Sequence, residues 1–152
     1  MLKKSLHYLK IYHRLPIDFK RLLWQAAWQS LIVECQLQLR YSKAFKTYQD
    51  NLPETMLTTS KQKRQVLQMT KVMRMLEQRA PWTPMCLNRA VVSKKILRKQ
   101  GIETTIHVGF KPRESTKEFE GHAWLTIGHF FITGHIPQLK TYQEMRPVLE
   151  KG

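Results

Sequence analysis

The chain has 152 residues, of which 42% are hydrophobic, and this predicts one modest core in a single domain over residues 1–152. Lysine and arginine number 26 against 11 acidic residues, so the net charge of +15 predicts a cationic surface that attracts acidic peptides, nucleic acid or anionic lipid. Two cysteines are too few for a disulfide framework, no secretory signal follows Met1, and no apolar run approaches the roughly 18 residues of a membrane span, which together predict a cytoplasmic protein.

Helical periodicity dominates the first half of the chain. Apolar residues recur at helical spacing from about residue 16 to residue 45. Asparagine, proline and threonine then mark a connector over residues 50–59, after which Thr59 or Ser60 is expected to cap a second helix that Pro81 ends. We therefore assign residues 1–79 to a helical part.

Residues 80–140 are assigned to a second part of the domain, the candidate catalytic core. A third helix begins near Cys86, because Pro84 suits the first turn of a helix, and Gly101 is placed to end it. The pattern then alternates as in strands over residues 103–110, 120–127 and 129–133. The predicted fold class is α+β, with a helical N-terminal half packed on a core of a Cys-bearing helix and a small antiparallel sheet.

Cys86 and His122 are the candidate nucleophile and base. A cysteine in the first turn of a helix meets unpaired backbone N–H groups and the positive end of the helix dipole, which favour the thiolate. If the fold brings His122 beside it, the imidazole can take the thiol proton and return it to a leaving amine. A lone cysteine is more often a small buried hydrophobe, which is our interpretation of Cys35.

The order of these features is typical of papain-like and transglutaminase-like thiol enzymes. The region from about residue 80 to 134 resembles the transglutaminase-like domain of lasso-peptide B proteins, the cysteine peptidases that remove the leader from a ribosomally made precursor. The helix that contains Leu22-Leu23-Trp24-Gln25-Ala26 also resembles the N-terminal helical part of that family. The shared segments are Pro81-Trp82, Cys86-Leu87-Asn88-Arg89-Ala90, Gly101-Ile102, His107-Val108-Gly109-Phe110 and His122-Ala123-Trp124-Leu125.

The resemblance implies a leader peptidase that acts through a Cys86 thioester with His122 as base and needs no cofactor. It also implies three partners: the precursor peptide, a small leader-recognition protein of winged-helix type that acts in trans, and the ATP-using macrolactam synthetase. The recognition protein is expected in trans because the first half of the chain matches peptidase helices and leaves no room for such a domain. No metal site is predicted, since the cysteines and histidines lack close ligand spacing.

The sequence differs from the family pattern at the third catalytic residue. In the family an aspartate commonly follows the catalytic histidine by about a dozen positions, whereas here Ile132-Thr133-Gly134-His135 contains no carboxylate. Thr133, His135 or a backbone carbonyl are candidates to orient His122. Glu120 is a further candidate, because alternate residues of a strand project from the same face.

Residues that stabilise the oxyanion or contact the substrate are predicted near Cys86. The backbone N–H of Cys86 is the natural first oxyanion donor, with Trp82 Nε1 or the amide of Gln78 as the second. Arg89 and Trp124 are candidate substrate contacts. Tryptophan beside a small core is more commonly a packing residue, and Arg89 can equally bind an internal carboxylate.

Two alternatives of different class stay open. In the first, the basic and aromatic side chains of the helical half bind nucleic acid or an anionic membrane surface. For a peptidase we expect no nucleic-acid partner, whereas peripheral contact with a membrane is compatible with that function. In the second, the chain is a catalytically inactive scaffold of the same fold that holds the precursor, an idea that the missing aspartate favours.

Overall fold

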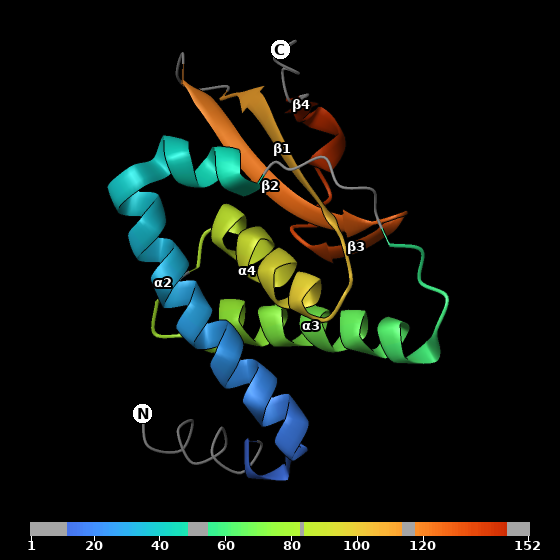
Figure 1. Cartoon of the computed structure of the whole chain (residues 1–152). Coiled ribbons are helices and arrows are strands. Elements are labelled where there is room, and N and C mark those ends of the chain that lie inside the picture. Colours follow the sequence, from blue (N-terminus) through green and yellow to red (C-terminus); the bar gives the residue numbers. More distant parts are fainter. Residues whose placement is uncertain (1–11, 49–54, 83, 114–117, 146–152) are drawn as a thin grey trace.

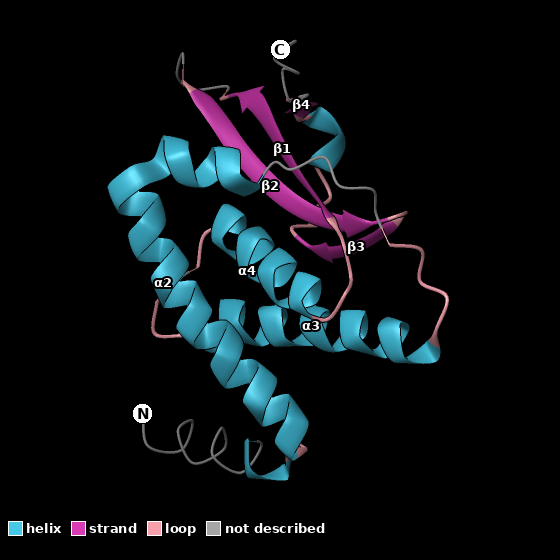
Figure 2. Ribbon diagram, in the orientation of Figure 1, coloured by secondary structure: helices cyan, strands magenta, loops and turns pink. Residues whose placement is uncertain are grey.

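Three long helices cover one face of a small antiparallel sheet in this computed structural model, which describes residues 12–48, 55–82, 84–113 and 118–145 (Figure 1). The predicted α+β class is confirmed (Figure 2). The helices are α2 (Ile17–Tyr48), α3 (Ser60–Arg79) and α4 (Cys86–Lys99), and the strands are β1 (Thr105–Pro112), β2 (Phe119–Ile127), β3 (Phe130–Thr133) and β4 (Gln143–Glu144), with a 3₁₀ turn at Leu139–Thr141.

Local signals explain where the elements begin and end. Thr59, one of the two residues expected to cap α3, is the N-cap. Its side chain accepts from the Gln62 N–H, and the Gln62 side chain accepts from the Thr59 N–H. Gly101 follows α4 with φ of +75°, a conformation that glycine adopts without steric cost. Strand β1 starts and ends two residues later than the sequence predicts.

The sheet has the order β3-β2-β1-β4, and every pairing is antiparallel. In the β1–β2 pair, Ala123 lies opposite Val108 and His122 lies opposite Gly109. Ala123 and Val108 belong to the hydrophobic core that the helices share with the sheet. Because successive side chains of a strand point to opposite faces, His122 projects from the other face of β2.

Helix α4 is the central element of the fold. It packs against α2 and α3 as well as β1, β2 and β3, and Figure 1 shows it between the other helices and the sheet. An amphipathic surface helix buries one stripe, whereas α4 buries residues around most of its circumference. The position of its N-terminus is therefore fixed from several sides. Its buried residues are Leu87, Asn88, Ala90, Val91, Val92, Ser93, Lys94, Ile96 and Leu97.

A buried polar network ties the first turn of α4 to α2. The Asn88 amide nitrogen donates to the Ser30 carbonyl at 2.8 Å and to Glu34 Oε2 at 2.7 Å. Ser30 Oγ donates to Asn88 Oδ1 at 2.9 Å, and Trp82 Nε1 donates to Ser30 Oγ at 3.2 Å. Asn88 and Ser30 are buried, so the two bonds between them form away from bulk water, whereas the bonds that involve Glu34 and Trp82 are partly buried. The network holds the start of α4 in one place relative to α2.

We expect Asn88→Ala to lower the free energy of unfolding by roughly 2 kcal/mol, because it leaves the Glu34 carboxylate and the Ser30 carbonyl without their donor. Urea unfolding followed by circular dichroism measures the loss. Gln25→Ala, at an exposed position of α2, is the control and should change stability by less than about 0.5 kcal/mol. Equal stability of the two variants would contradict a structural role for the network.

Candidate active site

Cys86 is the first residue of α4 and is half-buried. The residue before it, Met85, is the N-cap and makes no side-chain hydrogen bond to the first turn. The N–H groups at this end of the helix therefore lack the side-chain acceptor that usually satisfies them, and the positive end of the dipole faces the sulfur without a cap. This is the placement that the sequence predicts for a nucleophile.

Cys86 and His122 line the same cavity, which has a volume of about 350 Å³. Its wall comes from Glu34 and Leu37 of α2, the start of α4, and the part of β1 and β2 around Phe110. Most of the exposed wall is apolar, as is typical of a pocket that binds an organic ligand. The fold thus brings together two residues that are far apart in the sequence.

The imidazole of His122 is held by a backbone carbonyl. His122 Nε2 lies 2.7 Å from the Gly134 oxygen. A carbonyl oxygen can only accept, so Nε2 carries the hydrogen and Nδ1 is the basic nitrogen of the neutral ring. The carbonyl was one of the alternatives that the sequence leaves open. Gly134 lies 12 residues after His122, the spacing at which the resemblance implies an aspartate.

Gly134 has no room for any side chain. Its φ is +79°, and a Cβ atom would lie 2.5 Å from the Ala123 oxygen and 2.8 Å from the Trp124 Cα atom. Contacts this short between a Cβ atom and neighbouring backbone require the strands to move apart. The close approach of Gly134 to β2 is what brings its carbonyl to the His122 ring.

Aromatic rings flank His122 on its face of the sheet. The Trp124 ring stacks on it, with centroids 6.2 Å apart and planes at 20°, and the Tyr142 ring lies 5.5 Å away. Trp124 also stacks on His107 at 5.4 Å and is 7% exposed. Of the two predicted roles for Trp124, this burial supports packing rather than substrate contact.

No hydrogen bond joins the Cys86 sulfur to the His122 ring in the described part of the chain. The alternation of β2 turns His122 away from the core face on which Ala123 lies. Catalytic hydrogen bonds are often long or misaligned before a substrate binds and tighten only in the complex. The substrate-free site therefore presents the two residues at one cavity without a direct bond between them.

Glu120 is bonded elsewhere, so the structure does not support it as the group that orients His122. Tyr142 Oη donates to Glu120 Oε1 at 2.5 Å, and Lys111 Nζ lies 3.6 Å from Glu120 Oε2. The hydrogen bond from Tyr142, followed by the charge of Lys111, lowers the pKa of Glu120. Burial, followed by the bond to Glu120, raises the pKa of Tyr142.

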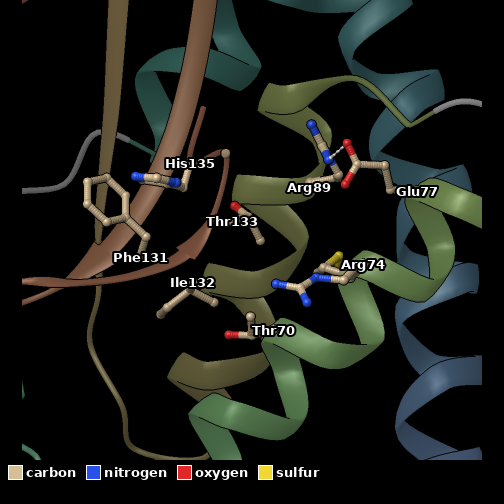
Figure 3. Close-up of a pocket in the computed structure, with 10 residues that line it drawn as sticks. Thr70, Arg74, Glu77, Arg89, Phe131, Ile132, Thr133 and His135 are labelled. Atoms are coloured by element: carbon tan, nitrogen blue, oxygen red, sulfur yellow. Dashed lines mark ion pairs between the residues drawn. The ribbon is translucent and has the colours of Figure 1, made fainter. Parts of the chain in front are cut away.

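Thr133 and His135 do not bond His122 either. Thr133 Oγ1 is buried without a partner, and the His135 ring packs edge-on against Phe131 at 4.8 Å. Both side chains line a second, smaller cavity, which neither Cys86 nor His122 lines (Figure 3). Neither side chain is therefore the third catalytic member in this structure.

The predicted oxyanion donors Trp82 and Gln78 have other positions. The indole N–H of Trp82 is already donated to Ser30 Oγ, and Gln78 is exposed on α3, outside the wall of the cavity that Cys86 lines. Arg89 forms an ion pair with Glu77. This agrees with the alternative in which Arg89 binds an internal carboxylate rather than the substrate. Of the predicted oxyanion donors, the backbone N–H of Cys86 is the one that remains.

Sequence reasoning missed Ser30, Glu34 and Asn88, which position the helix, and it did not single out Gly134 among the backbone alternatives. Asn88 lies two residues after Cys86, but its partners are more than 50 residues away in the sequence, and no local pattern links them.

Within the described residues no cluster of three or more His, Cys, Asp or Glu side chains could hold a metal ion. Across the same residues, no helix has the length and apolar character needed to cross a membrane.

Comparison with known proteins supports the same fold family. A family model described as "Transglutaminase-like superfamily" matches residues 18–147, which is most of the chain. No curated protein and no solved structure matches the chain.

We expect Gly134→Ala to lower the free energy of unfolding by at least about 2 kcal/mol more than Gly101→Ala. Both glycines have φ above +70°, but a Cβ atom at Gly101 would have no neighbour within 4 Å, so only Gly134→Ala adds an overlap. The cost of Gly101→Ala is the conformational penalty of about 1 kcal/mol. Chemical denaturation of the two variants measures the difference, and equal losses would mean that the close approach of Gly134 to β2 is unimportant.

We expect the stabilising effect of the Tyr142–Glu120 bond to disappear in acid. The folded pKa of Glu120 is below its unfolded value, so its contribution is present above the unfolded pKa and is lost as the pH falls through the folded pKa. Tyr142→Phe keeps the ring beside His122 and removes the hydroxyl. The stability difference between the wild type and Tyr142→Phe should be largest near neutral pH and decrease as the pH falls through the folded pKa of Glu120. A difference that is independent of pH would contradict this ionic contribution.

Proposed function

Because the chain belongs to the transglutaminase-like superfamily, we propose that it is a cysteine peptidase that removes the leader from a ribosomally synthesised lasso-peptide precursor. One observation carries the proposal: Cys86, at an uncapped helix start, shares a cavity with His122, whose ring has Nε2 fixed as a donor. The lasso-peptide substrate comes from the resemblance of the segments around Cys86 and His122, described above.

In the proposed acylation step, the Cys86 sulfur attacks the carbonyl carbon of the scissile peptide bond. His122 Nδ1 takes the thiol proton and delivers it to the leaving amine when the C–N bond breaks. The negative charge that develops on the carbonyl oxygen is stabilised by the backbone N–H of Cys86 and the N-terminal end of α4. The products of this step are a thioester on Cys86 and a core peptide with a free amino terminus.

In the proposed hydrolysis step, a water molecule attacks the thioester while His122 Nδ1 removes its proton. The C–S bond breaks, the proton returns to the sulfur, and the leader leaves with a new carboxylate. The Gly134 carbonyl accepts from Nε2 throughout and so keeps Nδ1 as the nitrogen that exchanges protons. A carbonyl has no full negative charge, so it stabilises the transient imidazolium less than an aspartate does.

The size of the cavity supports a requirement for partners. A volume of about 350 Å³ holds a few residues beside the scissile bond rather than a long leader. We propose that a leader-recognition protein of winged-helix type presents the precursor in trans, and that the macrolactam synthetase uses the amine that the cut releases. The exposed Trp24 and Trp28 on α2 offer apolar surface for such contacts.

A catalytically inactive scaffold that holds the precursor is the second candidate. Two observations favour it: His122 has no carboxylate partner, and its ring makes no hydrogen bond to the Cys86 sulfur in the described part of the chain. The scaffold and the peptidase differ in one outcome, the cleavage of a precursor.

We expect mass spectrometry to detect cleavage when a lasso-peptide precursor is incubated with this protein and a recognition partner. Cys86→Ala should abolish the cut because it removes the nucleophile. His122→Ala should slow it by at least about 100-fold, the usual contribution of a positioned general base. Cys35 is exposed on α2, so its interpretation as a buried residue is wrong. Cys35→Ala removes this exposed thiol and is the matched control, which should cut at the wild-type rate.

Circular dichroism should show that all three variants are folded. A precursor that binds to the wild type and stays intact would favour the scaffold, and cleavage that survives in Cys86→Ala would disprove the thiol mechanism.

A further inference from the structure

A second cavity, of about 130 Å³, lies between α3, α4 and β3 on the side of the molecule that carries Arg74 and Arg89 (Figure 3). Cys86 and His122 do not line it, so it is distinct from the candidate active site. It is smaller than the roughly 300–1,000 Å³ of pockets for drug-sized ligands. Its size suits a single compact polar group.

The cavity has a cationic wall. Arg74 extends from α3 toward β3, and Arg89 enters from the first turns of α4 (Figure 3). Among the residues that the structure describes, Glu77 is the one acidic residue that lines the cavity, and it already forms an ion pair with Arg89 Nη1. One positive charge therefore remains in excess at the wall when His135 is neutral. Guanidinium groups present several N–H donors in a fixed plane and bind carboxylate or phosphate oxygens well.

Two buried polar atoms at this cavity have no partner. Thr133 is 8% exposed, and its Oγ1 makes no hydrogen bond; Arg89 Nε is also buried without an acceptor. More than nine in ten buried polar groups in proteins are hydrogen-bonded. Both atoms are donors of residues that line the cavity, so an oxygen acceptor that reaches either atom would supply its missing hydrogen bond.

We propose that this cavity is a binding site for a small oxyanion, either free phosphate or a carboxylate group. Arg74 supplies the charge, and Arg89 Nε and the Thr133 hydroxyl supply donors from α4 and β3. The site therefore links three elements through one ligand. This inference does not depend on the thiol chemistry of Cys86.

The proposed anion site adjoins the residue that orients His122. Gly134 lines this cavity, while its carbonyl accepts from His122 Nε2. An anion bound to Thr133 would hold the end of β3 next to Gly134. The bound state should therefore restrain the backbone of residues 133–135.

The test is isothermal titration of the full chain with sodium phosphate and, separately, with sodium acetate, at an ionic strength held constant with sodium chloride. Arg74→Gln and Arg64→Gln form a matched pair, because both remove one positive charge from exposed positions of α3 and only Arg74 lines the cavity. We expect Arg74→Gln to weaken anion binding at least about tenfold and Arg64→Gln to change it by less than about twofold.

Thr133→Val separates binding from folding. It removes the unpartnered hydroxyl with little change of shape, so it should weaken the anion severalfold while the anion-free protein keeps at least wild-type stability. Binding of phosphate indicates a free oxyanion as ligand, and binding of acetate alone indicates a carboxylate group. The proposal is overturned if neither anion binds, or if Arg74→Gln and Arg64→Gln weaken binding equally, since the effect would then be general screening by a cationic surface.

Discussion

The burial of α4 between the helical layer and the sheet is the constraint on which the rest of the structure depends. Every other long helix and three strands pack on this one element. Because its side chains are enclosed on most sides, its N-terminus cannot shift without opening the core. The bonds from Asn88 to Ser30 and Glu34 then fix the first turn. Cys86 lies two residues before Asn88, so the packing of α4 and this network together fix its position.

The sequence contained enough to predict the framework. The hydrophobic period, the helix caps and the glycines identified the long helices and the three main strands to within about three residues, because these signals are local. The order of a helix that begins at Cys86 and a strand that carries His122 was also sufficient to suggest the superfamily. Strand β4 was missed, since two residues carry no periodicity, and its pairing with β1 is a long-range contact.

The groups that orient the site could not be predicted for a physical reason. A search for a third catalytic member in a sequence looks for side chains, such as Glu120 or Thr133, whereas the partner of His122 is a peptide oxygen. Every residue has such an oxygen, so the sequence does not distinguish one from another. The side chain of Trp82 was similarly ambiguous, because its choice of Ser30 as acceptor depends on how α2 and α4 cross.

A peptide oxygen also differs from a carboxylate in its response to acid. An aspartate that holds an imidazole takes up a proton at low pH and then loses the charge that favours this contact. The Gly134 oxygen does not titrate anywhere in the range in which proteins stay folded. The acceptor that holds the His122 ring therefore does not change with acidification. A side-chain substitution at position 134 also leaves this acceptor in place, because the oxygen belongs to the backbone.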